Sequence, residues 1–462
     1  MAPGLARPAL RTPDRFSPGE VARGDVDPHP NDAQHGADAA AVIVSPPLHV
    51  AEIHGIFDRN PTDQSRMHDR IAHRLAHAAA LQVVVVETNE GLCDHVAAWQ
   101  DLADNALEAN VFYEPWLLMP ALKNLHPGTP LRLVFIYEPA SPGTGASKLC
   151  GFFPLEPDSR FRNLPIRAWR MWKHIHCFLC TPLIRSERAR ETLAALLQWA
   201  GGRGRAHMLD FSHVRGDGPF HDLLGTHVKE TGTRQYVTNR FVRALWKAGQ
   251  GMDDYLQSTL SPGVRKEYRR QRKRLAELGR LEFRTLREGA EVDDWLEEFL
   301  SLEASGWKAR EGQALGLSTS QRSFVLTAAR LGFARGQVYL QGLYLDGRPV
   351  AMLLSFLAGG GGFAFKIAYD ETLSKYSPGV QLMLDILGCL HSDSRFAWMD
   401  SCAEPDHPMI DRLWKEKKII ESVLVSTGNR LGNAAVSVFP AGRRLIRLIR
   451  ELRSTTLFHA LR

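Results

Sequence analysis

The chain has 462 residues, 44% of them hydrophobic and 23% charged, with a formal net charge of +6 at pH 7. This length is too great for one hydrophobic core and predicts two domains of a globular protein, and no apolar run is long enough to span a bilayer. The N-terminus lacks an apolar signal core, and the six cysteines are scattered, so a disulfide framework is not expected and a cytoplasmic location is favoured.

The N-terminal segment is rich in proline up to Pro47 and contains a single aromatic residue, Phe16. It cannot bury enough apolar surface to offset chain entropy, so we expect a disordered extension over 1–80. From Leu81 to about residue 250, helical and strand patterns alternate, which predicts a first α/β domain. Its expected strands are 81–86, 131–137, 150–154 and 207–211, and its expected helices are 99–107 and 189–200.

A strongly basic helix is expected next, capped by Ser261 with Pro262 in its first turn. Eight basic and two acidic residues lie between Ser261 and Arg280, so this segment alone accounts for the net charge of the chain. The basic residues fall on all sides of the helix. A solvated helix between domains is therefore favoured over a contact with RNA or an anionic sugar nucleotide.

Residues 251–430 predict a second domain with a mixed α/β sheet. Its expected strands are 281–286, 338–345, 350–357, 362–368, 396–400 and 422–427, and its expected helices are 292–303, 321–335 and 409–417. The tail, 431–462, contains a basic amphipathic helix over 440–453. Packing on the domain or on a protein partner is favoured for this helix, with an anionic membrane surface as the alternative.

The segment after the strand at 362–368 has the pattern of a phosphate-binding turn. Ser377-Pro378-Gly379 opens an apolar helix, so several backbone N–H groups and the helix dipole would point at one spot. The alternative is an ordinary helix cap. The predicted ligand-binding residues are Lys375, Tyr376, Ser377, Pro378, Gly379, Val380 and Gln381.

Three side chains at the end of the expected strand 396–400 are candidates for acid–base chemistry: Asp400, Glu404 and His407. His407 could accept a proton near neutral pH, and Asp400 could orient it or bind an ammonium group. The alternative is that His407 and its neighbour Asp406 cap the following helix.

Trp307, Lys308 and Arg310 follow a helix of the second domain and could hold an anionic substrate, although a solvated helix end explains them equally well. Glu303 is a further candidate base on the same helical face. Cys177 and Cys180 form a lone Cys-x-x-Cys with no second pair, so no metal site is expected.

Four patterns occur in order after the basic helix: residues 305–312, the turn at 377–379, residues 400–408, and Leu413-Trp414. Together they resemble the acetyltransferase domain of the cellulose-biosynthesis accessory proteins (CelD type), which belongs to the GNAT superfamily. The similarity covers 264–428 and, more loosely, 99–183. It implies an α/β fold with two GNAT-like mixed sheets in tandem, as in Fem-type peptidyltransferases. Ser377-Pro378-Gly379-Val380-Gln381 stands where typical members have Gln/Arg-x-x-Gly-x-Gly/Ala.

The resemblance implies an acyl-CoA-dependent N-acyltransferase that uses acetyl-CoA or another acyl-CoA and no metal. The implied acceptor is a small amine or amino sugar, in cellulose, exopolysaccharide or envelope metabolism. Two alternatives stay open. One is a Fem-type transferase that takes its acyl group from aminoacyl-tRNA, with the basic helix as the RNA contact. The other is a non-catalytic accessory protein that docks through its C-terminal helix.

Overall fold

A computed structural model describes residues 81–87, 90–126, 128, 130–140, 147–159, 161, 165–306, 312 and 314–442. The predicted N-terminal extension and the tail beyond residue 442 lie outside these ranges. Within them, no helix combines the length and the apolar character needed to cross a membrane.

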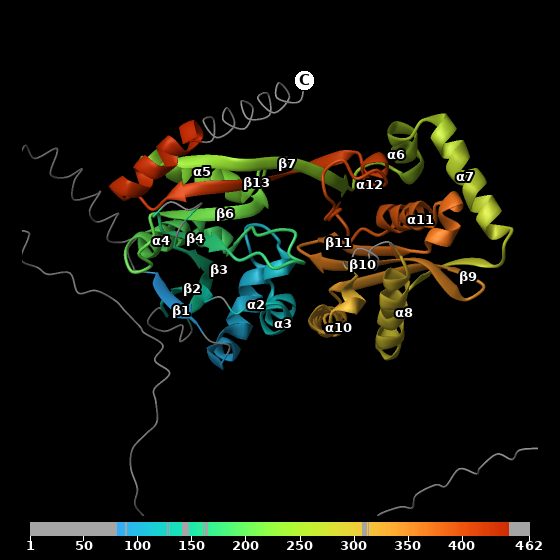
Figure 1. Ribbon diagram of the computed structural model, residues 1–462, viewed down its shortest axis with the longest axis horizontal. Helices are drawn as coiled ribbons and strands as arrows, with labels where there is room; N and C mark the ends of the chain where they lie inside the picture. Colours follow the sequence, from blue (N-terminus) through green and yellow to red (C-terminus); the bar gives the residue numbers. More distant parts are fainter. Residues whose placement is uncertain are drawn as a thin grey trace, which may run out of the picture. The chain divides into compact units, whose positions relative to one another are not determined.

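The described strands form one mixed sheet of thirteen strands (Figure 1). The first half of the chain supplies six strands of its main order, one short additional strand, and four α-helices that pack around the sheet. The strands are β1 (Gln82–Val86), β2 (Arg132–Glu138), β3 (Lys148–Asp158), β4 (Ala168–Met171), β6 (Met208–Arg215) and β7 (Gln235–Lys247), with the short β5 (Leu183–Ile184) beside β3. The helices are α2 (Val96–Asp104), α3 (Pro115–Leu125), α4 (Ala189–Gly201) and α5 (Pro219–Thr231).

Two helices, α6 (Met252–Thr259) and the basic α7 (Pro262–Ala276), lead into the second half. Its strands are β8 (Leu281–Thr285), β9 (Val338–Leu345), β10 (Arg348–Ala358), β11 (Gly361–Tyr369), β12 (Trp398–Asp400) and β13 (Glu416–Ser426). Its helices are α8 (Val292–Ser305), α10 (Thr319–Ala334), α11 (Pro378–Ser392) and the single turn α12 (Ile410–Leu413).

The two halves are repeats of one topology. In each, an antiparallel meander (β1-β2-β3-β4 or β8-β9-β10-β11) is followed by a strand that pairs in parallel with its last member, β6 with β4 and β12 with β11. The order along the sheet is β1-β2-β3-β4-β6-β13-β7-β12-β11-β10-β9-β8. The last strands are therefore exchanged: β7 of the first repeat pairs with β12, and β13 of the second pairs with β6.

Helices cover both faces of the second repeat, with α8 and α10 on one face and α11 on the other (Figure 1). Because both faces are covered, β10 is buried along nearly its whole length and reads as an apolar run rather than an alternating one. Helix α3 packs against α10, its counterpart in the other repeat. One core cluster consequently runs through both repeats, and Phe112 of the first contacts Phe363 of the second.

One prediction fails in this region, and one strand was not predicted. The helix expected over 409–417 is limited to Ile410–Leu413, because the chain becomes extended at Trp414 and Glu416 already pairs with Leu245 of β7. Strand β7 itself was not expected, since its charged residues hide the strand pattern. Pairing with β13 along almost its full length overrides that local signal.

Candidate functional site

The predicted strand–turn–helix unit is present. Strand β11 ends at Tyr369, the 3-10 helix η8 (Glu371–Tyr376) follows, and Ser377 joins it to α11 with φ 53° and ψ 55°. This left-handed conformation is uncommon for a residue with a side chain. The hydroxyl of Ser377 makes no capping hydrogen bond, whereas Ser261, before the same Pro-Gly-Val sequence in α7, accepts from the Val264 amide. The ordinary-cap interpretation therefore describes α7 and not α11.

The residues of the turn differ in what they could offer a ligand. Pro378, Gly379 and Gln381 are buried, and the Gln381 side chain donates from Nε2 to the Tyr268 carbonyl of α7 at 3.1 Å. Lys375 is exposed, and Ser377 and Val380 are half-buried.

Space at the turn is narrow around Gly379. A Cβ on this residue would lie 3.3 Å from Cδ1 of Tyr369 and 3.4 Å from Sδ of Met409. A larger residue would push these neighbours apart, so glycine preserves the close packing of β11, α11 and the loop after β12. The first turn of α11 is thus held rigidly beside the end of the strand.

The parallel pairing of β11 with β12 stops early. It covers only Gly361–Phe363 against Trp398–Asp400, and β11 then continues to Tyr369. In the first repeat the pairing of β4 with β6 is equally short, but the chain after β4 returns alongside β6. There the Cys180 amide donates to the His213 carbonyl, and the Arg215 amide donates to Oγ1 of Thr181.

Asp400 ends β12 and is fully buried. Its Oδ2 accepts from Nη2 of Arg243 at 2.6 Å and from Nζ of Lys418 at 2.8 Å, while Oδ1 accepts from the Cys402 amide at 3.0 Å. Burial alone would raise the pKa of the carboxyl, but the two cations hold it below its usual range. Through these bonds, Asp400 ties the end of β12 to β7 and β13.

The other two acid–base candidates lie in the loop after β12. Glu404 is exposed and His407 is half-buried. Nδ1 of His407 accepts from the amides of Met409 and Ile410, both at 3.4 Å, so this residue caps the short α12. The bonds leave the proton of a neutral ring on Nε2. The loop also contains two left-handed residues, Cys402 and Asp406, and burial strongly raises the pKa of the Cys402 thiol, which is therefore protonated.

The predicted substrate residues Trp307, Lys308 and Arg310 lie outside the described residues. The helix that precedes them, α8, ends at Ser305 beside the end of β11. Glu303 is buried and accepts from the Leu315 amide at 2.9 Å, and with Gly306 it lines a small cavity of about 20 Å³ at the end of β11.

Arg243 and Lys418 are the residues that the sequence interpretation missed. Arg243 is a single charge inside the apolar run Phe-Val-Arg243-Ala-Leu-Trp, and Lys418 is the last of four consecutive charged residues before Ile-Ile. A buried charge within a strand needs a partner, so these two positions could have been recognised as members of buried ion pairs, although not assigned to Asp400. What the sequence could not supply was the exchange of β7 and β13 that brings them together.

The geometry agrees with the comparison of this chain with known families. Residues 262–407 match the family model described as acetyltransferase (GNAT) domain, which is the CelD-type family. The matched range begins in α7 and includes the α11 turn, Asp400, Glu404 and His407. The second repeat therefore carries a GNAT acetyltransferase domain. Because the first repeat has the same strand order, the predicted tandem of GNAT-like sheets is confirmed.

The solved structures that resemble this chain have low sequence identity to it. FemX is 11% identical with a TM-score of 0.46, over 74% of this chain and 96% of FemX. The C-terminal domain (DUF2156) of a putative lysylphosphatidylglycerol synthetase from Agrobacterium fabrum is 13% identical with a TM-score of 0.43, over 76% and 96% of the two chains. A tandem GNAT protein from the clavulanic acid biosynthesis pathway is 13% identical with a TM-score of 0.36, over 75% and 99%. No curated protein sequence matches the chain significantly.

Proposed function

We propose that this protein is an acyl-CoA-dependent N-acyltransferase, and that its second repeat binds acetyl-CoA or a related thioester. The observation that carries the proposal is the GNAT domain match over 262–407, which contains a strand, a left-handed turn residue and a helix start whose serine does not cap it. Backbone N–H groups at a helix start, together with the helix dipole, bind phosphate groups well.

The diphosphate of the thioester is proposed to lie at the first turn of α11. The amides of Gly379 and Val380 would donate to it, since Pro378 has no amide hydrogen and the Gln381 amide already donates to the Ser377 carbonyl at 3.0 Å. Lys375 is exposed and adds a positive charge at the entrance of the turn. Tyr376, which is buried, and Gln381, whose side chain bonds α7, hold the turn in place.

In the reaction the acceptor amine attacks the thioester carbonyl. A C–N bond forms, the C–S bond breaks, the amine loses a proton and the departing thiolate takes one up. We propose Glu404, the exposed carboxylate of the loop, as the acceptor of the amine proton, while the departing thiolate takes its proton from water. Nε2–H of His407 is proposed to donate a hydrogen bond to the leaving sulfur and to keep its proton. Asp400 acts as a positioning residue, because it fixes the end of β12 from which this loop departs.

The acceptor is proposed to be an amine or amino sugar used in exopolysaccharide or envelope metabolism, and the reaction is placed in the cytoplasm. The free state of all six cysteines supports a reducing compartment. Binding of an anionic acceptor by Lys308 and Arg310, beside Trp307, belongs to this proposal.

The test is a calorimetric titration of acetyl-CoA into the wild type, Ser377→Asp and Ser377→Asn. Aspartate and asparagine both tolerate a left-handed conformation, and a negative charge at a helix start favours the helix. Ser377→Asp should therefore fold as stably as the wild type and yet lose at least about tenfold in affinity, because its carboxylate would lie where the diphosphate binds. Ser377→Asn should change the affinity little.

Equal affinities of the aspartate and asparagine variants would refute the binding mode at α11. Absence of acetyl-CoA binding by the wild type would instead favour the non-catalytic accessory protein.

A further inference from the structure

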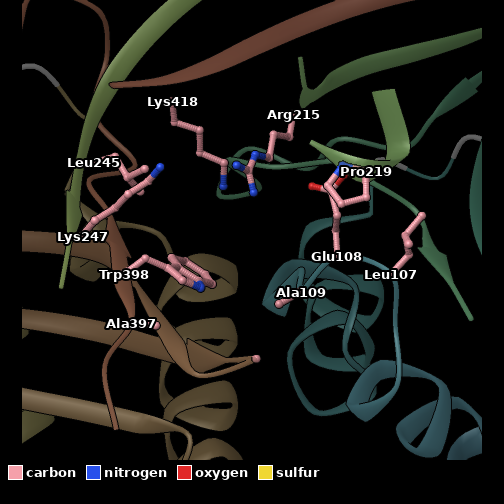
Figure 2. A pocket seen from close by; sticks show the side chains of 11 residues that line it. Leu107, Glu108, Ala109, Arg215, Pro219, Leu245, Lys247, Ala397, Trp398 and Lys418 are labelled. Atoms are coloured by element: carbon pink, nitrogen blue, oxygen red, sulfur yellow. The ribbon is translucent and has the colours of Figure 1, made fainter. Parts of the chain in front are cut away.

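A second cavity lies between the two repeats, away from the turn before α11 (Figure 2). Its volume is about 300 Å³, the lower end of the range of small-molecule sites. The residues before β11 and the first residue of β12 line it, so it lies at the start of β11. The α11 turn follows the end of β11. The lining residues come from both repeats: Leu107, Glu108, Ala109, Arg215, Pro219, Leu245, Lys247, Gly359, Ala397, Trp398 and Lys418.

The charge of the cavity is positive. Among the lining residues, three cations, Arg215, Lys247 and Lys418, stand against one carboxylate, Glu108. Arg215 also pairs with Asp217 through Nε at 2.8 Å, and Lys418 shares Asp400 with Arg243, so four cations and three carboxylates leave one excess positive charge. Figure 2 shows the nitrogen-bearing ends of Arg215 and Lys418 pointing toward one another above the cavity, with Lys247 reaching in from the opposite wall. Like charges that converge in this way repel one another, and an anion between them would relieve the repulsion.

The one carboxylate is already engaged. Glu108 is buried, and its Oε1 accepts from the Phe220 amide at 2.6 Å in the first turn of α5. It therefore occupies the start of that helix itself. A Cβ on Gly218 would come within 2.8 Å of both carboxylate oxygens, so a glycine is required for Glu108 to reach this position. A cationic ligand would find little unused negative charge here.

The cavity also has an aromatic and apolar lining. Trp398 projects into the cavity between Lys247 and Ala109 (Figure 2), and Leu107, Leu245 and Pro219 complete the apolar lining. The Trp398 ring lies against Gly361, where a Cβ would come 2.2 Å from the indole, and it meets Phe363 edge-on at 5.2 Å between centroids. The indole is thus fixed as a flat wall.

The two sides of the cavity are held together tightly. Gly359 adopts φ +53°, and a Cβ on it would come 2.4 Å from Cβ of Ala109 in the first repeat. Lys418 is fixed by its bond to Asp400 and lies 5.5 Å from the Trp398 ring centroid. The site is consequently preformed, and a ligand would not have to order it.

We propose that this cavity is a binding site for a small organic anion that carries a flat ring. Its phosphate or carboxylate lies among Arg215, Lys247 and Lys418, and its ring lies against Trp398. Such a ligand contacts both repeats at once, and its binding does not depend on the thioester site proposed at α11.

The probe for this site is phenyl phosphate, with benzoate as the carboxylate counterpart and phenol as the neutral one. The protein is labelled with 5-fluorotryptophan, and the ¹⁹F resonance of Trp398 among the 10 tryptophans is assigned with a Trp398→Phe variant. Phenyl phosphate, benzoate or both should shift this resonance saturably, and the tighter of the two identifies the preferred anion. Phenol should bind at least about tenfold more weakly than the better anion.

Lys247→Glu is the decisive variant, because Lys247 is exposed and its replacement leaves the core intact. It should weaken anion binding by about fivefold or more, the size expected for a charge reversal at a solvated contact. Lys229→Glu, an equal change of charge near the far end of α5, should leave binding unchanged.

Phenol binding as tightly as the anions, equal affinities of the Lys247→Glu and Lys229→Glu variants, or no response of the Trp398 resonance would each overturn the proposal. No thioester is present in the titration, so its failure is independent of acetyl-CoA binding.

Discussion

The two repeats place an aspartate at the same point of the sheet, but the balance of charge around it is negative in the first repeat and positive in the second. Asp210 and Asp400 each end the parallel pairing of their repeat, Asp210 opposite Arg170 of β4 and Asp400 opposite Phe363 of β11. In the first repeat, Arg170 is shared by three carboxylates, those of Glu156, Asp158 and Asp210. In the second, two cations share the single carboxylate of Asp400.

One topology thus carries opposite charge balances at equivalent points of its two copies. The first repeat has an excess of negative charge at this point, and its chain returns beside β6 to occupy the gap after β4. The second repeat has an excess of positive charge, and β11 extends beyond its parallel partner. The excess of positive charge therefore lies in the repeat that matches the GNAT domain.

The largest effect is expected when Asp400 is changed. Asp400→Ala leaves Arg243 and Lys418 buried without a counter-charge, and we expect a loss of about 3 to 5 kcal/mol in the free energy of unfolding. Asp210→Ala leaves Arg170 with two other carboxylates and should cost only about 1 kcal/mol. Urea unfolding of both variants checks the comparison. Equal losses would show that the two aspartates have the same role and that the difference in charge is without consequence.

A third buried carboxylate tests what happens when no cation is present. Glu114 accepts from Nε1 of Trp116 and from Nε2 of Gln337, both at 2.7 Å, and burial raises its pKa to about 7. The folded state thus favours the protonated form. The stability due to this group is complete below about pH 4.5 and declines as the pH rises through 7, by roughly 3 kcal/mol in total.

Glu114→Gln cannot ionise and should abolish this decline. The variant should be more stable than the wild type at pH 8 and nearly equal to it at pH 4.5. Thermal or urea unfolding across this range measures the difference. A wild-type curve that is parallel to that of Glu114→Gln would contradict the raised pKa.

The smallest effect concerns the two Ser-Pro-Gly-Val helix starts. Ser261 caps α7, and Ser377 does not cap α11. Ser261→Ala should therefore cost about 1 kcal/mol of unfolding free energy, and Ser377→Ala only a few tenths. If Ser377→Ala is the more costly change, its hydroxyl stabilises the turn in some other way, and the case for a vacant helix start at α11 is lost.

Much of the fold was predictable because its signals are local. The β-branched run Leu81–Val86, the apolar strands β9 to β11 and the Ser-Pro helix starts all lie where the sequence placed them. The repeat in the order of elements was visible as well. The exchange of β7 and β13 was not, because the pairing of strands far apart in sequence leaves no periodic trace in either strand.

The candidate site was predictable in part for the same reason. The α11 turn is continuous in sequence, and its strand, turn and helix start follow one another as expected, whereas the left-handed conformation of Ser377 was not predicted. Asp400 was identified, but its partners come from β7 and β13, so its buried ion pairs could not be foreseen. The cavity around Trp398 depends on both repeats and has no sequence motif of its own.

The exchanged strands also constrain how the molecule is made. During synthesis the first repeat emerges complete in sequence at β7, yet the strand that closes its sheet beside β6 is β13, which ends at Ser426. Until then β6 presents an unpaired edge, a kind of surface that invites association with other chains. Cutting the chain between β7 and α6 would leave each piece with the other's closing strand, so the repeats are expected to fold as one cooperative unit rather than one after the other.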